Sequence, residues 1–313
     1  MKPQDGRPAV VAIVGPSAVG KSRVAVELAL RLGGEIVSAD SRLLYRGLDI
    51  GTDKPTPADR KRIPHHLIDV ADPGETWSLA QYCSAAQAAL RAILARHRLP
   101  IVVGGTGQYM RALLQGWSLA RGAVDPEVRL GWQRIADRVG SEALHAMLAE
   151  TDPAAAARID RRNVRRVIRA LEVHQITGIP ASRQPRRQPI AFHYLVFGLS
   201  LPREELYRRL DARLDEMLRR GLVEEVQRLL AEGVPPDAPS LSAIGYAQIV
   251  RCLQGEWPLE KAVAEVRRQS RVLVRHQANW FRPGDPSIEW HLARPGLDEE
   301  LADAIKRRLA GDL

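Results

Sequence analysis

Cysteines and long apolar runs are scarce in this 313-residue chain. The two cysteines, Cys83 and Cys252, lie far apart and outside any C-x-x-C spacing, which argues against a disulfide framework or a zinc site. No apolar run approaches the roughly 20 residues that cross a bilayer. Residues 1–15 pass from a polar lead into a short apolar segment, without the hydrophobic region of a secretory signal. We therefore expect a cytoplasmic protein that does not interact with a membrane.

Acidic residues are fewer than basic ones. Lys and Arg number 46 against 37 for Asp and Glu, which gives a formal net charge of +9. Such an excess is typical of proteins that bind a polyanion such as nucleic acid, although a solvated basic surface explains the same balance. With 45% apolar residues, the chain can form one large domain or two modest ones. Nothing in the sequence indicates an obligate oligomer, so we expect a monomer.

Short apolar segments and helical periods alternate in the first part of the chain. The apolar segments are typical of strands that are buried on both faces of a parallel sheet. This alternation predicts a doubly wound α/β fold, with functional residues at the carboxyl ends of the strands. The predicted strands are 9–15, 35–40, 66–70 and 99–105, and the predicted helices are 21–33 and 79–97.

A helical insertion is expected to interrupt this core. From about residue 118 to 190 the sequence shows helical periods and no convincing strand. After that come a strand at 190–201, one long helix at 203–233, a proline-containing loop at 231–240, a basic helix at 261–282, and a tail with one strand and one helix. We predict a catalytic core of residues 1–117 and 191–313 and a helical insertion of residues 118–190.

The segment GPSAVGKS matches the pattern G-x-x-x-x-G-K-S of a phosphate-binding loop. Glycines let backbone N–H groups point at anionic oxygens, and the following helix adds its positive end. Lys21 supplies a charge that reaches the phosphates, and the Ser22 hydroxyl is placed to bind Mg²⁺. The predicted phosphate-binding residues are Gly15, Pro16, Ser17, Ala18, Val19, Gly20, Lys21 and Ser22.

The acidic residue that an ordinary nucleotide hydrolase needs is missing from its usual place. The strand at 99–105 ends in glycines where the acid would stand, so the bound phosphates need not be those of ATP. Asp40 does end a strand beside the loop. Taken alone, it is more readily explained as the cap of the next turn.

Seven segments in collinear order resemble the tRNA dimethylallyltransferases, and together they cover the chain up to about residue 285. They are GPSAVGKS, SADSRLLYRGLDIGTDKP (38–55), PHHLIDV (64–70), GGTGQYMRALLQG (104–116), NVRRVIRALEV (163–173), SAIGYAQ (242–248) and RRQSRVLVRHQANWFR (267–282).

The resemblance implies a P-loop NTPase-like sheet and a prenyl transfer. In this family the dimethylallyl group moves from dimethylallyl diphosphate to the exocyclic amine of adenosine 37 of tRNA, next to the anticodon. The loop would then hold the diphosphate of an isoprenoid instead of ATP. Asp40 matches the general base of the family, and Thr106 matches the residue whose hydroxyl lies near the amine and the diphosphate. Without this match, Thr106 would be explained as a turn residue that bonds its own backbone.

The resemblance also implies how tRNA is bound. The target base must leave its stack to reach a buried carboxylate, and Asp40, Ser41, Arg42 and Leu43, together with Thr106, would meet it. Leu43 departs from the family pattern, which has Gln there, and a Leu side chain cannot hydrogen-bond a base. Recognition of the adenine by a side-chain amide at this position is therefore in doubt.

Basic segments supply further candidates. The family match assigns Arg165, Arg166, Val167, Ile168 and Arg169 to a tRNA-contacting stretch, although Val167 and Ile168 are better suited to packing their own helix. Nine arginines lie between residues 158 and 187, and five more lie between 267 and 282. These arginines suit phosphate contacts, and solvated helix faces are the alternative.

Arg213 and Arg209, one helical turn apart, are candidates to clamp the diphosphate from the opposite side. A solvated charged face explains the same pair equally well.

Three other functions remain open from the sequence. A kinase shares the loop and the sheet, but it would need the missing acid and not the arginine-rich insertion. A nucleotide-switched RNA-binding protein would not need Asp40. A prenyltransferase that acts on a free adenine nucleotide would not need an RNA-sized basic insertion.

Overall fold

The computed structural model describes residues 6–118, 125–185 and 187–310 of the chain. It divides into two compact units, one formed by Met1–Gln115 with Ile190–Leu313 and the other by Gly116–Pro189. We call them the core unit and the insertion unit. The sequence placed the two boundaries at 117/118 and 190/191.

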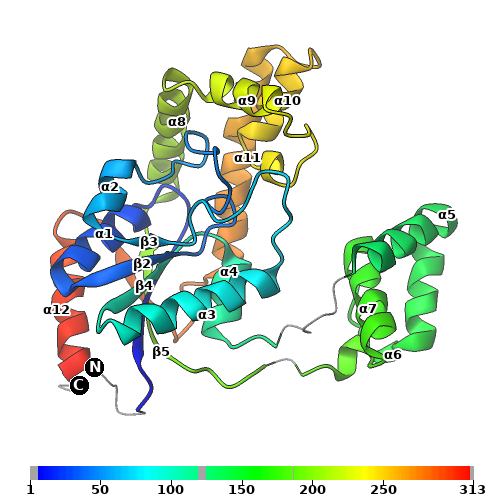
Figure 1. The fold of residues 1–313 in the computed structure, drawn as a ribbon, viewed down its shortest axis with the longest axis horizontal. Coiled ribbons are helices and arrows are strands. Elements are labelled where there is room, and N and C mark those ends of the chain that lie inside the picture. The colour runs from blue at the N-terminus through cyan, green and yellow to red at the C-terminus, as the bar shows by residue number, and fades with distance from the viewer. Residues whose placement is uncertain (1–5, 119–124, 186, 311–313) are drawn as a thin grey trace. The chain divides into compact units, whose positions relative to one another are not determined.

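A six-stranded parallel sheet forms the centre of the core unit (Figure 1). In the order β3-β2-β4-β1-β5-β6, β1 lies between β4 and β5, with Val11 opposite Ile101 on one side and Leu195 on the other. All six residues of β1 are buried, which explains its unbroken apolar sequence. The strands are β1 (Ala9–Val14), β2 (Gly34–Ser38), β3 (His65–His66), β4 (Leu99–Val103), β5 (His193–Ser200) and β6 (Glu289–Leu292).

Helices cover both faces of this sheet. Leu28 of α1 (Lys21–Leu32) and Ile305 of α12 (Leu297–Ala310) share one core cluster with Ile13 and Ile101 of the strands. Alternate strand residues point to the opposite face, where α3 (Leu79–Ala95) contacts β2 and β4, and α4 (Gly107–Leu114) packs against α3. A short helix, α2 (Pro57–Arg62), precedes β3.

Four further helices pack against one another at one end of the core unit (Figure 1). Ion pairs join two of them, because Arg271 of α11 lies 2.7 Å from Asp211 of α8 and Arg267 of α11 lies 2.5 Å from Asp215 of α8. The helices are α8 (Arg203–Arg219), α9 (Leu222–Ala231), α10 (Tyr246–Leu253) and α11 (Leu259–Trp280), with a short 3-10 turn at Ser240–Ser242.

Two predicted elements differ from the structure. The single helix expected at 203–233 is two helices, α8 and α9, because Gly221 adopts a left-handed conformation with φ of 95° and ends the helical path. The strand expected at 66–70 ends at His66, since Leu67 and Asp69 have φ of 61° and 57°. Both errors concern turns that the apolar periodicity does not reveal.

The insertion unit has a hydrophobic core of its own. Leu144, Leu148 and Val167 are fully buried there and pack with Leu171. Apart from one isolated bridge between Trp117 and Arg187, the described residues of this unit form helices and loops. The helices are α5 (Pro126–Thr151), α6 (Pro153–Ala156), α7 (Val164–Thr177) and a 3-10 turn at Ala181–Arg183.

Within the described residues, no helix can span a membrane. In the three described ranges, every helix is too short or too polar to cross a bilayer.

Candidate active site

The phosphate loop follows β1 at the carboxyl edge of the sheet. Gly15 has φ of 141°, and a Cβ atom there would lie 2.5 Å from the carbonyl oxygen of Leu199 in β5. Only glycine therefore fits at this start of the loop. Ala18 and Gly20 also have positive φ, 63° and 101°. These turns wind the backbone into the concave path that a phosphate group requires.

The first turn of α1 lies open at this loop. Its N-cap residue, Gly20, has no side chain to bond the free N–H groups of the turn, so these groups are available to an anion. Ser22 is exposed and lines the cavity in front of the loop. The loop and the first turn of α1 thus form a geometry that can receive phosphates.

Lys21 is buried beneath the loop. Its side chain is 9% exposed, and its Nζ atom donates a hydrogen bond to the Pro16 carbonyl oxygen at 2.7 Å. Burial lowers the pKa of Lys21 from 10.5 to about 8, the nearby Asp40 carboxylate partly opposes this effect, and Arg213 adds to it. A phosphate group would stabilise the charged form again.

Asp40 and Thr106 come together where the loops after β2 and β4 run side by side. The Ala39 N–H donates to the carbonyl oxygen of Val103 at 2.8 Å, and the Thr106 N–H donates to that of Ala39 at 3.2 Å. A Cβ atom at Gly104 would lie 2.1 Å from the Ala39 carbonyl oxygen. The glycine in this position is therefore what lets the two loops approach.

The Thr106 hydroxyl orders the residues that follow Asp40. Its oxygen accepts a hydrogen bond from the Ser41 N–H at 3.0 Å and donates to the Ser41 hydroxyl at 3.3 Å. It does not cap its own helix, α4, so the alternative of a local turn threonine does not apply. Asp40 accepts from the Arg42 N–H at 2.8 Å through Oδ1. The carboxylate is thus held in a fixed direction.

Two adjoining cavities meet at Asp40. The phosphate-loop cavity has a volume of about 430 Å³ and is lined by Lys21, Ser22 and other loop residues. The second cavity has a volume of about 440 Å³ and is lined by Thr106, by residues of α8, α9 and α11, and by the segment 242–245 before α10; we call it the α8–α11 cavity. Five residues line both: Ser17, Asp40, Thr52, Gly105 and Arg213. A molecule with a charged end and an apolar end can lie across this boundary.

Arg213 of α8 reaches both cavities and is itself held in place. It donates to the Thr52 carbonyl oxygen at 3.3 Å and lies 3.3 Å from the Asp53 carboxylate. Arg209 lines only the phosphate-loop cavity and lies 2.7 Å from the Glu205 carboxylate. Of the two candidate arginines, Arg213 has the position that faces both the phosphate loop and Asp40.

Residues 41–43 divide between the two cavities. Ser41 and Arg42 line the α8–α11 cavity, and Arg42 is tied to its wall by donating to the carbonyl oxygen of Pro239 at 2.8 Å. Leu43 lines the phosphate-loop cavity instead, near Ile68. Leu43 thus shares a cavity with Asp40 but not with Ser41, Arg42 and Thr106, the other residues with which the sequence grouped it.

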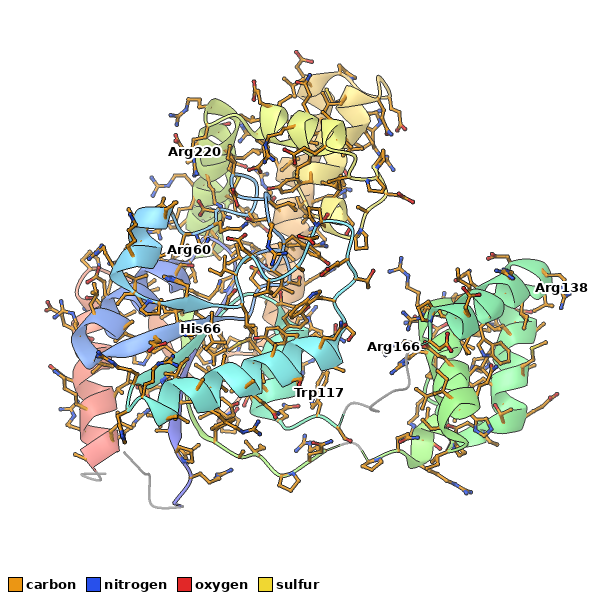
Figure 2. The ribbon with its side chains drawn as sticks, viewed as in Figure 1. Arg60, His66, Trp117, Arg138, Arg166 and Arg220 are labelled. Carbon is orange, nitrogen blue, oxygen red and sulfur yellow. The ribbon has the colours of Figure 1, made fainter. Side chains whose placement is uncertain are left out.

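Val167 and Ile168 are not available to tRNA. They are 0% and 4% exposed and belong to the core of the insertion unit, so their side chains cannot contact RNA. This corrects their assignment to the tRNA-contacting stretch. In the same helix, Arg165 and Arg166 are exposed, and Figure 2 shows Arg166 on the outer side of α7. Arg169 pairs with the fully buried Glu172 at 2.9 Å.

Several of the other candidate RNA-binding arginines form ion pairs. In the basic helix α11, Arg267 and Arg271 pair with α8, and Arg268 lies 2.6 Å from Glu265. In the insertion unit, Arg161 and Arg162 pair with Glu142 and Asp160 at 3.1 and 2.9 Å. Arg186 lies outside the described residues. The number of arginines in a segment therefore overstates the cations that it offers to a partner.

Gln277 and Trp280 of α11 also reach the site, and sequence reasoning gave them no role there. Both line the α8–α11 cavity. The Trp280 ring lies so close to Gly107 that a Cβ atom there would be 2.1 Å from its Cγ. Gln277 shares the buried face of α11 with Val266 and Val274. A polar residue on an otherwise apolar helical face was the signal that could have identified it.

These features define a class of protein. A phosphate loop at the carboxyl edge of a parallel sheet, a fixed carboxylate beside it, and a mixed cavity beyond are the elements of a P-loop protein that acts on a phosphorylated substrate. The predicted P-loop NTPase-like fold is confirmed by the sheet and by the structural relatives.

Comparisons with known proteins identify the family. The IPP transferase model matches residues 43–284. A tRNA dimethylallyltransferase of Thermomicrobium roseum is 51% identical over 304 residues, which are 97% of this chain and 92% of the relative. That of Pelotomaculum thermopropionicum is 44% identical over the full length of both chains. The chain therefore belongs to the IPP transferase family.

Solved structures agree with this result. The full-length tRNA isopentenylpyrophosphate transferase of Bacillus halodurans is similar with a TM-score of 0.70 and 37% identity, over 97% of each chain. A eukaryotic dimethylallyltransferase acting on tRNA gives a TM-score of 0.83 and 26% identity, over 97% of this chain and 80% of the other. The resemblance stated from the sequence motifs is confirmed.

Proposed function

We propose that this protein transfers the dimethylallyl group of dimethylallyl diphosphate to the exocyclic amine of adenosine 37 of tRNA, next to the anticodon. The observation that carries the proposal is the position of Asp40 on the boundary between the phosphate-loop cavity and the α8–α11 cavity. The activity for which its relatives are named, tRNA dimethylallyl transfer, supports it.

The phosphate-loop cavity suits the donor. The loop amides, Lys21 and Arg213 surround it with positive charge, and a diphosphate needs the same contacts as the terminal phosphates of a nucleotide. No carboxylate ends β4 to position a water molecule for hydrolysis. This suits a site where hydrolysis would destroy the donor.

The α8–α11 cavity suits the acceptor. Leu214 and Met217 of α8 contribute apolar surface to it, while Asp40 and Thr106 contribute polar groups. A nucleobase that has left its stack requires both an apolar surface for its ring and hydrogen-bond partners for its edge. Such a base could enter from this side and meet the allylic carbon at the boundary.

In the proposed reaction, the bond between the allylic carbon and the diphosphate oxygen breaks, and the electron pair leaves with the diphosphate. Lys21, the loop amides and Arg213 stabilise the charge that builds up there. The adenine N6 forms the new bond to the carbon and gives up one proton, which Asp40 accepts. Thr106 fixes the position of Ser41, and with it that of the adjacent Asp40, through its two hydrogen bonds to Ser41.

Prenyl transfer in this family generally uses a divalent metal, and we propose Mg²⁺. The described residues contain no group of three or more His, Cys, Asp or Glu side chains able to bind a metal by themselves. Mg²⁺ fits such a site, because it binds through few protein oxygens together with phosphate oxygens and water. The exposed Ser22 hydroxyl would be its protein ligand. When bound, the ion would neutralise charge on the diphosphate.

The tRNA partner is the anticodon stem-loop, with Arg165 and Arg166 of the insertion unit as phosphate contacts. Their exposure supports this role. The protein would act as a monomer in the cytoplasm, where its tRNA substrate is found.

The decisive experiment incubates the purified protein with labelled dimethylallyl diphosphate and either unmodified tRNA or AMP. We expect label in tRNA alone, at the adenosine beside the anticodon. Label in AMP alone would refute the proposal, and so would phosphate transfer from ATP without any need for the isoprenoid.

Asp40→Asn tests the role of the carboxylate. A positioned general base contributes about 10²- to 10⁴-fold to a rate, so we expect a loss of turnover in this range with tRNA binding retained. Asp303→Asn, at an exposed aspartate of α12, is the matched control. Full activity of the Asp40 variant would show that another group accepts the proton.

A further inference from the structure

Gln277 is a buried amide at the centre of the site. It lies near the end of α11 and is 5% exposed. Its neighbours on the same helical face are the buried residues Ala262, Val266 and Val274. Burial of an amide costs free energy unless its hydrogen bonds are made, so the partners of this side chain indicate what it does.

Both ends of the amide are used. The Oε1 atom accepts a hydrogen bond from the N–H of Ser17, the third residue of the phosphate loop, at 2.8 Å. The Nε2 atom donates to the carbonyl oxygen of Gly105 at 3.0 Å. Gly105 directly precedes Thr106, so this one side chain connects the phosphate loop to the loop after β4, which carries Thr106 and runs beside Asp40.

The contact is tightly packed. A Cβ atom at Gly105 would lie 2.6 Å from the Gln277 Nε2 atom and 3.8 Å from the Lys21 Nζ atom. A larger residue at position 105 would therefore separate Gln277 from its partner. Because Gly105 has no side chain, Gln277 and Lys21 can both lie close to the backbone just before Thr106.

The end of α11 is itself held firmly. Val274, one turn before Gln277, belongs to the core cluster on the sheet. Beyond it, Arg111 of α4 donates to the carbonyl oxygen of Trp280 at 2.6 Å and pairs with Asp285 at 2.8 Å. Helix α11 is also joined to α8, which carries Arg213, through Arg271 and Asp211. Gln277 is thus fixed relative to both sides of the site.

We infer that Gln277 is a positioning residue for the transfer. It sets the distance between the phosphate loop, which carries the leaving group, and the Asp40–Thr106 pair, which receives the acceptor. The inference rests on the proposed transfer reaction. Reacting atoms in such a step must meet within narrow limits, and a misplacement of about 1 Å lowers a rate on the order of 100-fold. Gln277 is the side chain that bonds to both loops at once.

The test compares Gln277→Met with the wild-type protein. Methionine keeps the length and volume but makes neither hydrogen bond, so Ser17 and Gly105 are no longer connected. Gln269→Met is the matched control, because Gln269 lies on the same helix and its side chain donates to Glu265 of that helix at 2.8 Å. Four quantities are measured: kcat, the dissociation constants of inorganic diphosphate and of tRNA, and the urea midpoint of unfolding.

We expect kcat of Gln277→Met to fall by about 10- to 100-fold. Both dissociation constants should stay within about threefold of wild type, because neither binding surface loses a charged group. An unchanged kcat would overturn the inference. A loss of diphosphate affinity equal to the loss of rate would also overturn it, because Gln277 would then act through binding.

Gln277→Glu provides a second test if the methionine variant does not fold. Glutamate keeps an acceptor for the Ser17 N–H. Its second oxygen faces the Gly105 carbonyl oxygen, and these two oxygen atoms repel each other. We expect a fall in kcat of similar size, together with a urea midpoint below that of wild type, because one oxygen of the buried carboxylate has no donor. Wild-type kcat in this variant would refute the inference. If the wild-type protein itself fails to label tRNA, the proposed function fails and not the role of Gln277 alone.

Discussion

Replacement of Lys21 by methionine should stabilise the free protein while it removes donor binding. Lys21 is buried, and burial lowers its pKa from 10.5 to about 8. The folded protein therefore carries the lysine charge at neutral pH at a cost in free energy. Methionine fills similar space without a charge, but it cannot bind a phosphate group.

The size of the effect follows from the pKa. A shift from 10.5 to about 8 corresponds to about 3 kcal/mol of unfolding free energy at neutral pH. The variant also loses the hydrogen bond from Nζ to the Pro16 carbonyl oxygen, and this loss lowers its stability by about 1 kcal/mol. We expect Lys21→Met to be more stable than wild type by about 2 kcal/mol at about pH 7.

The pH dependence is the sharper test. Between pH values near 8 and 10.5 the unfolded chain holds the Lys21 proton more tightly than the folded one. Raising the pH through this window therefore stabilises the folded wild-type protein. The advantage of the variant should shrink by about 2 kcal/mol between about pH 7 and about pH 9.5.

Urea unfolding of both proteins at the two pH values measures these differences. Lys306→Met, at an exposed lysine of α12, is the control and should show no such change. A variant that is less stable than wild type at about pH 7, or an advantage that does not depend on pH, would refute the reasoning. Inorganic diphosphate should stabilise wild type and not the variant.

Three further predictions concern charge. In wild type, kcat/KM for the donor should decline as the pH rises past about 8, because Lys21 loses its proton; a pH–rate profile flat through this range would contradict this. Arg166→Ala should weaken tRNA binding and lower the salt slope of the binding constant by about one unit, as filter binding at several salt concentrations would show. Arg169→Ala should instead lower the unfolding midpoint, because it removes one of the two cations beside the buried Glu172; an unchanged midpoint with weaker tRNA binding would reverse this assignment.

The place of the phosphate loop, Asp40 and Thr106 at one edge of the sheet could be predicted from the sequence because each follows a buried strand. The roles expected of Asp40 and Thr106 came from the resemblance to the family. The carboxyl ends of neighbouring parallel strands lie at one edge of the sheet, so strand assignment alone places these residues near one another. The order β2-β4-β1 then brings the three loops together. This part of the site depends on local sequence and on one general rule of topology.

The direction of individual side chains could not be predicted in this way. Leu43 lines a different cavity from Arg42, and Arg169 forms an ion pair with the buried Glu172. The first result depends on the path of the chain in three dimensions. The second joins residues only three apart on α7, but it depends on the burial of Glu172 in the insertion unit. The Gln277 contacts span 260 and 172 residues, and no local pattern specifies such a pairing. The helix break at Gly221 likewise depends on packing, because glycine within a helical period does not by itself end a helix.

The strand order also has a consequence for how the chain is made. β1 is paired on one side by β4 and on the other by β5, and the entire insertion unit separates β4 from β5 in the sequence. A ribosome adds about 5 to 20 residues per second, so the nascent β1 exposes an open edge for on the order of ten seconds while the insertion unit is synthesised. Open strand edges promote aggregation, and the insertion unit can meanwhile assemble around its own core. The nascent chain should therefore depend most on chaperones while the insertion unit is being synthesised, before β5 closes the sheet.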